Sequence, residues 1–290
     1  MSNFIIKDFK KAWNKPENGL IKIILINIII FVSLSILKVV AEISGLGSMF
    51  QSFINMLMLP SDVKHFLFQP WSIITYFFLH LGFSHILWNM LFLYWFGKVI
   101  HENLGNNSLI SLYILGGIIG GLFYMAIYNI IPFYNDRVGF SLMLGASAGV
   151  FSVVVGSATL MPNYTFYLLF IGPIRIKYIA LFYFLTSFFD ITSQNAGGEI
   201  AHIGGALIGY IFIKQLKKGN NMGDPIIKIL SFFNNLNFEK KLKPTRPKEE
   251  ADENKTSQDE VDIILDKISK SGYASLTKEE KEKLFKLSKK

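Results

Sequence analysis

Long apolar blocks separated by short polar stretches run through residues 20–218. Six blocks contain few charged side chains; they cover residues 20–41, 75–97, 109–131, 147–161, 178–191 and 199–213. About 20 apolar residues are what an α-helix needs to cross the hydrocarbon core of a bilayer. The pattern predicts an all-α membrane protein, a bundle of six transmembrane helices, with a polar hinge at 101–107 between the second and third.

The fourth block is short for a membrane span. Residues 147–161 would rise about 22 Å as an α-helix, whereas the hydrocarbon core is about 30 Å thick. We therefore expect this helix to begin below the outer membrane surface, with Ser147 submerged.

Composition and charge support a membrane protein and exclude other classes. Hydrophobic residues make up 51% of the 290 residues, and the net charge is +8. Lysine and arginine are denser in the segments that the positive-inside rule assigns to the cytoplasm, so the charge does not indicate a nucleic-acid partner. We expect a plasma (inner) membrane protein with both termini cytoplasmic. The chain has no cysteine, which excludes disulfides and thiolate chemistry, and no metal or cofactor is predicted.

Beyond residue 218 the sequence becomes polar and charged. Ser257 with Glu260, and Thr277 with Glu280, have the spacing of capping boxes at the starts of two short helices. The sequence therefore predicts a soluble helical hairpin with an unknown partner. The predicted domains are a cytosolic segment 1–19, a membrane domain 20–218, an amphipathic segment and linker 219–256, and the hairpin 257–290.

Few polar side chains interrupt the apolar blocks, and each is a candidate for function because such residues are costly in a membrane. His85 and Asn89 are four residues apart and share one helical face, where both can donate to one point. Their alternative role is a hydrogen bond between helices. For His80 we predict a structural role, anchoring the preceding loop by hydrogen bonds to the backbone.

The segment Gly145–Gly149 places Ser147 in the first turn of the fourth helix, among small residues. His202 lies on a face that also carries Gly205 and Gly209, so this face can approach another helix closely. If the two helices pack together, the imidazole can activate the serine hydroxyl. No aspartate or glutamate is placed to orient the imidazole, so the pair would be a dyad, with Phe151 able to stack on the ring. The alternatives are close helix packing for the glycines and a structural hydrogen bond for His202.

The order His85-x-x-x-Asn89, Gly145-x-Ser147 and Ala201-His202-x-x-Gly205-x-x-x-Gly209 on the second, fourth and sixth helices resembles the rhomboid intramembrane serine proteases. The resemblance covers about residues 20–215. It implies that Ser147 is the nucleophile and His202 the general base and then acid. It also implies that His85, Asn89 and the backbone N–H of Ser147 donate to the oxyanion. The supporting residues would be Phe151, Gly145, Gly205, Gly209 and His80.

By this resemblance the substrates are transmembrane segments of other proteins in the lipid bilayer. One departure is Ala148, where the family commonly has glycine, and we expect this residue to affect how closely the oxyanion site can be approached. Two other functions predict different features in the sequence. A catalytically silent rhomboid-like binder of membrane helices would be expected to lose Ser147 or His202, and both are present. A transporter or channel would be expected to carry carboxylates within its spans.

Overall fold

The computed structural model describes residue 13 and residues 18–168, 172–236, 264–270 and 275–281. By its contacts the chain divides into two units, Met1–Phe233 and Asn234–Lys290.

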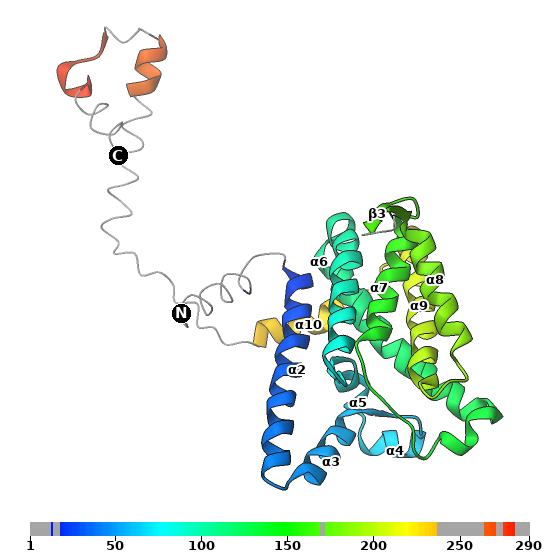
Figure 1. The fold of residues 1–290 in the computed structure, drawn as a ribbon. Helices are drawn as coiled ribbons and strands as arrows, with labels where there is room; N and C mark the ends of the chain where they lie inside the picture. The colour runs from blue at the N-terminus through cyan, green and yellow to red at the C-terminus, as the bar shows by residue number, and fades with distance from the viewer. Residues whose placement is uncertain (1–12, 14–17, 169–171, 237–263, 271–274, 282–290) are drawn as a thin grey trace. The chain divides into compact units, whose positions relative to one another are not determined.

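The first unit is a bundle of apolar helices (Figure 1). In the described residues, three helices are long and apolar enough to cross a membrane, namely α2 (Gly19–Ile43), α6 (Phe83–Ile130) and α9 (Ala196–Leu216). Two shorter apolar helices accompany them, α7 (Ser147–Leu160) and α8 (Ile176–Phe189). These helices agree with the predicted all-α membrane protein.

Helix α6 consists of two arms that meet at Gly105. This residue has φ 77° and ψ 177° between helical neighbours, a conformation that glycine adopts without the steric cost of a Cβ atom. The chain therefore turns back at Gly105. The predicted polar hinge over residues 101–107 was too long, because the other residues of this range belong to the two helical arms. With its two arms counted separately, α6 brings the number of apolar helical segments among the described residues to six.

Helix α7 packs between the second arm of α6 and α9 through glycine contacts. A Cβ atom on Gly205 would overlap the backbone oxygen of Ala148, and one on Gly209 would overlap that of Ser152. On the other side of α7, a Cβ atom on Gly149 would lie 2.7 Å from the Tyr113 oxygen of α6. The predicted close approach of the fourth and sixth helices is confirmed.

A chain of short elements leads from α2 to α6. It comprises α3 (Gly47–Leu57), β1 (Leu59–Pro60), α4 (Val63–Phe68), α5 (Ser72–Thr75) and the 3-10 helix η1 (Tyr76–Phe78). The prediction of a helix from residue 75 was wrong, because the backbone is extended at Leu79 and Gly82 and the helix begins at Phe83.

Two small antiparallel sheets interrupt the helical fold. Strand β1 pairs with β2 (Leu142–Met143), and this pairing joins the segment before α4 to the segment before α7. Strand β3 (Thr165–Leu168) pairs with β4 (Gly172–Arg175) between α7 and α8. A 3-10 helix, η2 (Pro132–Arg137), follows α6. Apolar periodicity could not predict these short strands.

Hydrogen bonds define one end of the bundle. The N–H of Gly19 donates to Asn106 Oδ1 at 2.8 Å, which brings the start of α2 to the α6 hinge. At the same end, Lys217 Nζ after α9 donates to the Thr159 oxygen of α7 at 3.1 Å. The amphipathic helix α10 (Asp224–Leu236) begins there too, since Ser111 Oγ donates to the Gly223 oxygen at 3.3 Å. We call this the hinge end.

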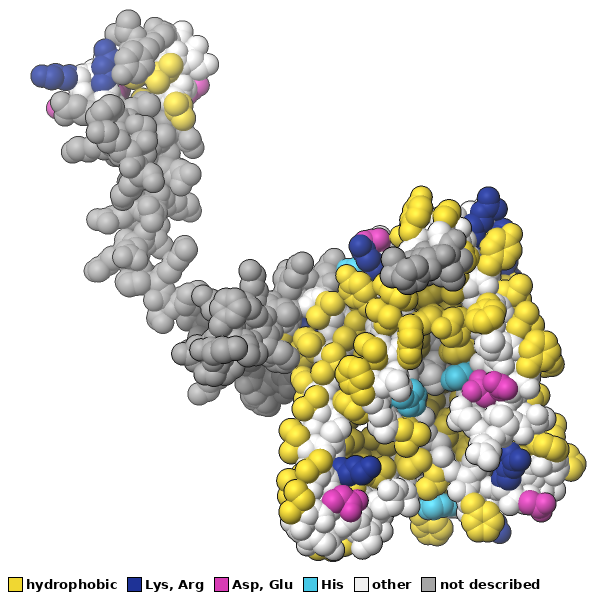
Figure 2. Space-filling view, in the orientation of Figure 1, with side chains coloured by type: hydrophobic (Ala, Val, Ile, Leu, Met, Phe, Trp, Pro, Cys, Tyr) yellow, Lys and Arg dark blue, Asp and Glu magenta, His cyan; other side chains and the backbone are white. Residues whose placement is uncertain are grey.

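The surface of the first unit is mainly hydrophobic. Figure 2 shows apolar side chains over most of the visible face, with Lys and Arg side chains toward its upper and lower parts and histidine and acidic side chains near the middle as well as toward the ends. A broad apolar surface on a chain of this composition is what a lipid environment requires.

The second unit contains one of the two predicted capping boxes. The N–H of Thr277 donates to Glu280 Oε2 at 2.7 Å, and the N–H of Glu280 donates to Thr277 Oγ1 at 3.3 Å. The Thr277 N–H and the Lys267 ammonium hold the pKa of the Glu280 carboxyl below its usual value. The prediction for Thr277 is confirmed, whereas Ser257 and Glu260 lie outside the described residues.

Candidate active site

Ser147 is the first residue of α7, and the turn before it depends on Gly145. Gly145 has φ 128°, which strains any residue with a Cβ atom, and its N–H donates to the Tyr76 oxygen at 2.9 Å. A Cβ atom there would lie 3.0 Å from the His85 ring. The first N–H groups of a helix have no partner within the helix, so the start of α7 presents backbone donors beside the Ser147 hydroxyl.

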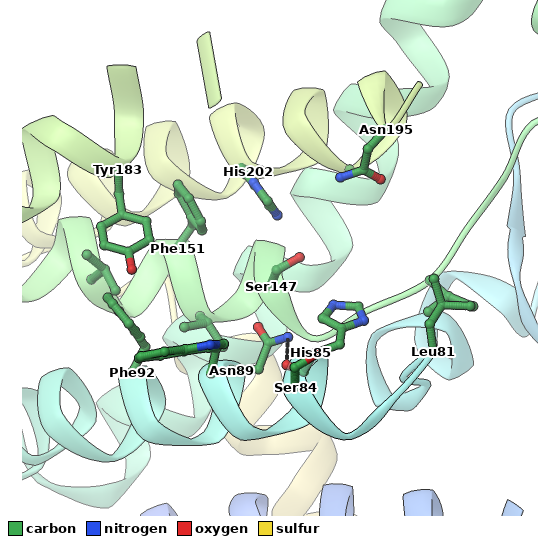
Figure 3. A pocket seen from close by; sticks show the side chains of 15 residues that line it. Leu81, Ser84, His85, Asn89, Phe92, Ser147, Phe151, Tyr183, Asn195 and His202 are labelled. Atoms are coloured by element: carbon green, nitrogen blue, oxygen red, sulfur yellow. Dashed lines mark hydrogen bonds between the residues drawn. The ribbon is translucent and has the colours of Figure 1, made fainter. Parts of the chain in front are cut away.

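His202 faces Ser147 from α9. Its ring stacks on Phe151 of α7 with centroids 4.2 Å apart and an interplanar angle of 9°, so the predicted contact with Phe151 is confirmed. Figure 3 shows the His202 ring and the Ser147 hydroxyl pointing toward each other, without a hydrogen bond between them. The stacking on Phe151 fixes the plane of the His202 ring.

Two groups contact Nδ1 of His202, on the other side of the ring. Glu199 Oε2 lies 3.1 Å away and Ser187 Oγ of α8 lies 3.0 Å away. The prediction that no acidic residue can orient the imidazole was therefore wrong. Glu199 is three residues before His202 on one helix, a spacing that places both side chains on the same face. The prediction treated Glu199 as the start of the sixth helix, although α9 begins earlier, at Ala196.

His85 and Asn89 reach the site from the first arm of α6. Asn89 is buried, and its Nδ2 donates to the His85 backbone oxygen at 2.9 Å. A carboxamide has two N–H donors, so one remains for a ligand. Both side chains line the same cavity as Ser147 and His202, as the shared helical face predicted.

His80 does not make the backbone hydrogen bonds predicted for it. Both of its ring nitrogens are buried without a hydrogen-bond partner, and its ring lies edge-on to His85 with centroids 5.2 Å apart. His80 lies in the bend between η1 and α6, where its ring packs against the His85 ring. His80 therefore packs behind a residue of the cavity and is not among the cavity's lining residues.

A cavity of about 370 Å³ joins these side chains. Its lining includes His85, Asn89, Ser147, Phe151 and His202. Gly205 and Gly209 lie outside it, at the contact between α7 and α9. Ala148 is also outside the cavity lining. Its methyl group faces the second arm of α6, where a Cβ atom on Gly120 would lie 2.6 Å from it.

A second cavity adjoins the first on the side between α6 and α8. It measures about 550 Å³ and is lined almost entirely by aromatic and aliphatic side chains. Trp88, Phe92 and Tyr183 line both cavities. The polar site therefore has an apolar neighbour within the bundle.

Together these features define a class: a multi-pass membrane protein whose polar side chains converge on one cavity. The combination of a hydroxyl, an imidazole and several N–H donors in that cavity has the parts needed for acyl transfer. A family model described as "Rhomboid domain" matches residues 67–218, more than half of the chain. The chain belongs to the rhomboid family.

Two curated proteins from Arabidopsis thaliana are similar to this chain. "RHOMBOID-like protein 12, mitochondrial" is 29% identical over 157 residues, which cover 51% of this chain and 47% of that protein. "Rhomboid-like protein 16, chloroplastic" is 24% identical over 177 residues, which cover 54% and 55% respectively. The chain thus spans about half the length of these relatives. Residues 251–290 match a second model, "Family of unknown function (DUF6576)".

Proposed function

We propose that the protein is an intramembrane serine endopeptidase that cleaves transmembrane segments of other membrane proteins. The observation that carries this proposal is the arrangement of Ser147 and His202, which face each other across a cavity inside an apolar helix bundle. A serine hydroxyl is a weak nucleophile near neutral pH and needs an adjacent base. Membership of the rhomboid family supports the same chemistry.

In the proposed mechanism, Ser147 Oγ attacks the carbonyl carbon of the scissile peptide bond while its proton passes to His202 Nε2. The carbonyl oxygen becomes an oxyanion that accepts hydrogen bonds from the Ser147 N–H, His85 and Asn89. The imidazolium then gives its proton to the leaving amine, and an acyl-enzyme remains. Water attacks the acyl group with His202 as base again, which releases the second product and restores Ser147.

The substrate would approach from the apolar second cavity. Trp88, Phe92 and Tyr183 form the boundary between the two cavities, so an apolar segment between α6 and α8 would lie next to Ser147. A local loss of helical structure is needed there, because the peptide carbonyls of an intact helix are hydrogen bonded within the helix.

We further propose six membrane crossings with both termini on the cytoplasmic side of a plasma (inner) membrane. The six apolar segments support the count. Helix α7 has 14 residues and would rise about 21 Å, less than the ~30 Å hydrocarbon core, so Ser147 would lie below the outer surface. The relatives' names give organelle locations for those proteins only.

The test is cleavage of a transmembrane substrate by the full-length protein in liposomes. We expect the wild type to cleave, and Ser147→Ala and His202→Ala each to abolish measurable cleavage. The matched controls are Ser52→Ala and His65→Ala, two exposed side chains on α3 and α4, which should cleave like the wild type. Equal cleavage by Ser147→Ala would overturn the assignment. A wild type that binds the segment without cleaving it would support the silent binder instead.

A further inference from the structure

Glu199 lies directly behind the imidazole of His202, as seen from the cavity. Its Oε2 is 3.1 Å from Nδ1, and the two side chains are only 15% and 14% exposed. The cavity lining includes His202, Asn195 and Gly198 but not Glu199. The carboxylate is therefore placed to act on the histidine and not on a substrate.

The other neighbours of this carboxylate are uncharged. Oε1 accepts a hydrogen bond from Asn195 Nδ2 at 3.0 Å, and Ser187 Oγ lies beside the same imidazole nitrogen. In the described residues no lysine or arginine pairs with Glu199, and its contact is with the His202 ring, which is charged only when it is protonated. A largely buried carboxylate is costly unless it is paired, so this contact accounts for its place in the bundle.

The chemistry of the contact selects one form of the imidazole. An ionised carboxylate only accepts hydrogen bonds, so Nδ1 must carry the hydrogen that it donates to Glu199. In the neutral ring the other nitrogen, Nε2, then holds a lone pair. Nε2 is the atom that faces Ser147 (Figure 3), and the lone pair is what a general base needs.

We propose that Glu199 is a positioning residue that fixes His202 in the tautomer with hydrogen on Nδ1. The proposal rests on the proposed function, and it extends the serine–histidine pair to a triad. When Nε2 takes the Ser147 proton, the imidazolium lies against the carboxylate, which balances its charge and stays ionised. The proton then leaves from Nε2 to the departing amine, so Glu199 never gains or loses one.

Ser187 contributes a second acceptor from α8. Nδ1 carries a single hydrogen, which the carboxylate and the hydroxyl oxygen share, and the serine hydrogen is free to turn toward the carboxylate. The contact also connects α8 to the histidine of α9.

A purely structural role for Glu199 makes a different prediction. An acidic residue in the first turn of a helix is favourable there, and its Oε1 holds the Asn195 side chain. Glutamine keeps the shape and the Oε1 acceptor, so a structural role predicts that Glu199→Gln behaves like the wild type and better than Glu199→Ala. The positioning role predicts that Glu199→Gln is less active than the wild type and no more active than Glu199→Ala. The reason is that the glutamine NH₂ can donate to Nδ1 and favour the tautomer with hydrogen on Nε2.

The kinetic test compares Glu199→Gln, Glu199→Ala and Glu199→Asp in the full-length protein in liposomes. We expect Glu199→Gln to lower kcat about 10- to 1,000-fold, within the ~10⁴-fold loss for aspartate-to-asparagine in a serine protease triad, with KM nearly unchanged. Glu199→Gln should be no better than Glu199→Ala, and Glu199→Asp should recover part of the loss. The matched control is Glu102→Gln, an exposed surface carboxylate that pairs with Lys98, which should keep the wild-type kcat.

The second measurement reads the tautomer directly by nitrogen-15 NMR of histidine-labelled protein in micelles. The chain has five histidines, and the His202 signals are identified by their loss in His202→Ala. We expect hydrogen on Nδ1 in the wild type and on Nε2 in Glu199→Gln. Hydrogen on Nε2 in the wild type, or a tautomer that Glu199→Gln leaves unchanged, overturns the proposal. The spectrum needs no substrate, so it tests the role of Glu199 independently of cleavage. The proposed function has a separate test, because cleavage by Ser147→Ala would overturn it.

Discussion

Asn89 divides its hydrogen-bonding capacity between its own helix and the cavity. One N–H reaches the His85 backbone oxygen, which holds the carboxamide in a fixed orientation. The other N–H is available where the oxyanion would form in the proposed mechanism. A donor that is already oriented needs no reorganisation during the reaction, which is why such groups stabilise a transition state effectively.

We therefore expect Asn89→Ala to reduce kcat with little change in KM. Loss of one oxyanion donor typically lowers kcat about 10²- to 10³-fold, and steady-state kinetics on a transmembrane substrate measures both constants. Asn103→Ala is the matched control, because Asn103 makes the same bond to its own helix, from Nδ2 to the Val99 oxygen at 2.7 Å. It lies toward the hinge end of the same arm and outside the cavity lining. An unchanged kcat in Asn89→Ala would remove Asn89 from the oxyanion site.

Ala148 shows how a departure at one residue is accommodated by another. Its side chain is 1% exposed and packs against Gly120 of α6. A methyl group needs a small neighbour at that point, and the glycine provides it. The Ala148 methyl group faces away from the cavity and does not narrow it.

At the scale of elements, the relative position of Ser147 and His202 depends on the contact between α7 and α9. At Gly205 this contact is between backbone atoms of α7 and a glycine Cα of α9, with no flexible side chain in between. Backbone atoms of two packed helices cannot yield as the end of a side chain can. The distance between the two helices, and with it the distance between serine and imidazole, is therefore set by the glycine.

Gly205→Ala should separate the two helices and lower both stability and activity. Overpacking of a tight contact costs about 1–3 kcal/mol, which exceeds the ~1 kcal/mol that alanine gains over glycine within a helix. Thermal unfolding in detergent and the cleavage rate measure the two effects. Gly139→Ala is the control, since a Cβ atom there meets nothing within 4 Å. Wild-type stability in Gly205→Ala would contradict the contact.

The sequence predicted the helices and five of the cavity residues, but it did not predict most of the connections between helices. Apolar length locates helices, and spacing places His85 with Asn89 on one face. The short strand pair β1–β2 depends on contacts between distant segments, which no local pattern contains. Glu199 was missed for a different reason: its three-residue spacing to His202 was visible, but the helix was expected to begin at Glu199, whereas α9 begins one turn earlier, at Ala196.

At the scale of the whole bundle, basic side chains gather at the hinge end. The described residues near that end include Lys22, Lys98, Arg175, Lys177, Lys214, Lys217 and Lys218. The opposite end has Lys38 in the last turns of α2, Lys64 in α4 and Arg137 in η2. This asymmetry is the pattern that the positive-inside rule associates with a cytoplasmic face, and it supports the proposed orientation.

The absence of cysteine makes this orientation simple to test. Single cysteines at Ser52, Asn163 and Asn220 replace exposed neutral side chains and leave the charge pattern intact. In intact cells, a maleimide that cannot cross membranes should label Ser52→Cys. It should label Asn163→Cys and Asn220→Cys only after permeabilisation, and the parent chain is the unlabelled control. Labelling of Asn163→Cys in intact cells would contradict the proposed orientation and indicate the opposite one.

The short α7 also has a consequence for the membrane itself. A helix of 14 residues cannot match a full bilayer, and a bilayer responds to such mismatch by thinning around the protein or by tilting its helices. With Ser147 at the end of this helix, its depth would depend on the lipid as well as on the fold. Lipids with shorter acyl chains would bring the serine nearer to the water layer, and under the proposed function the position of the cut along a substrate would shift with them.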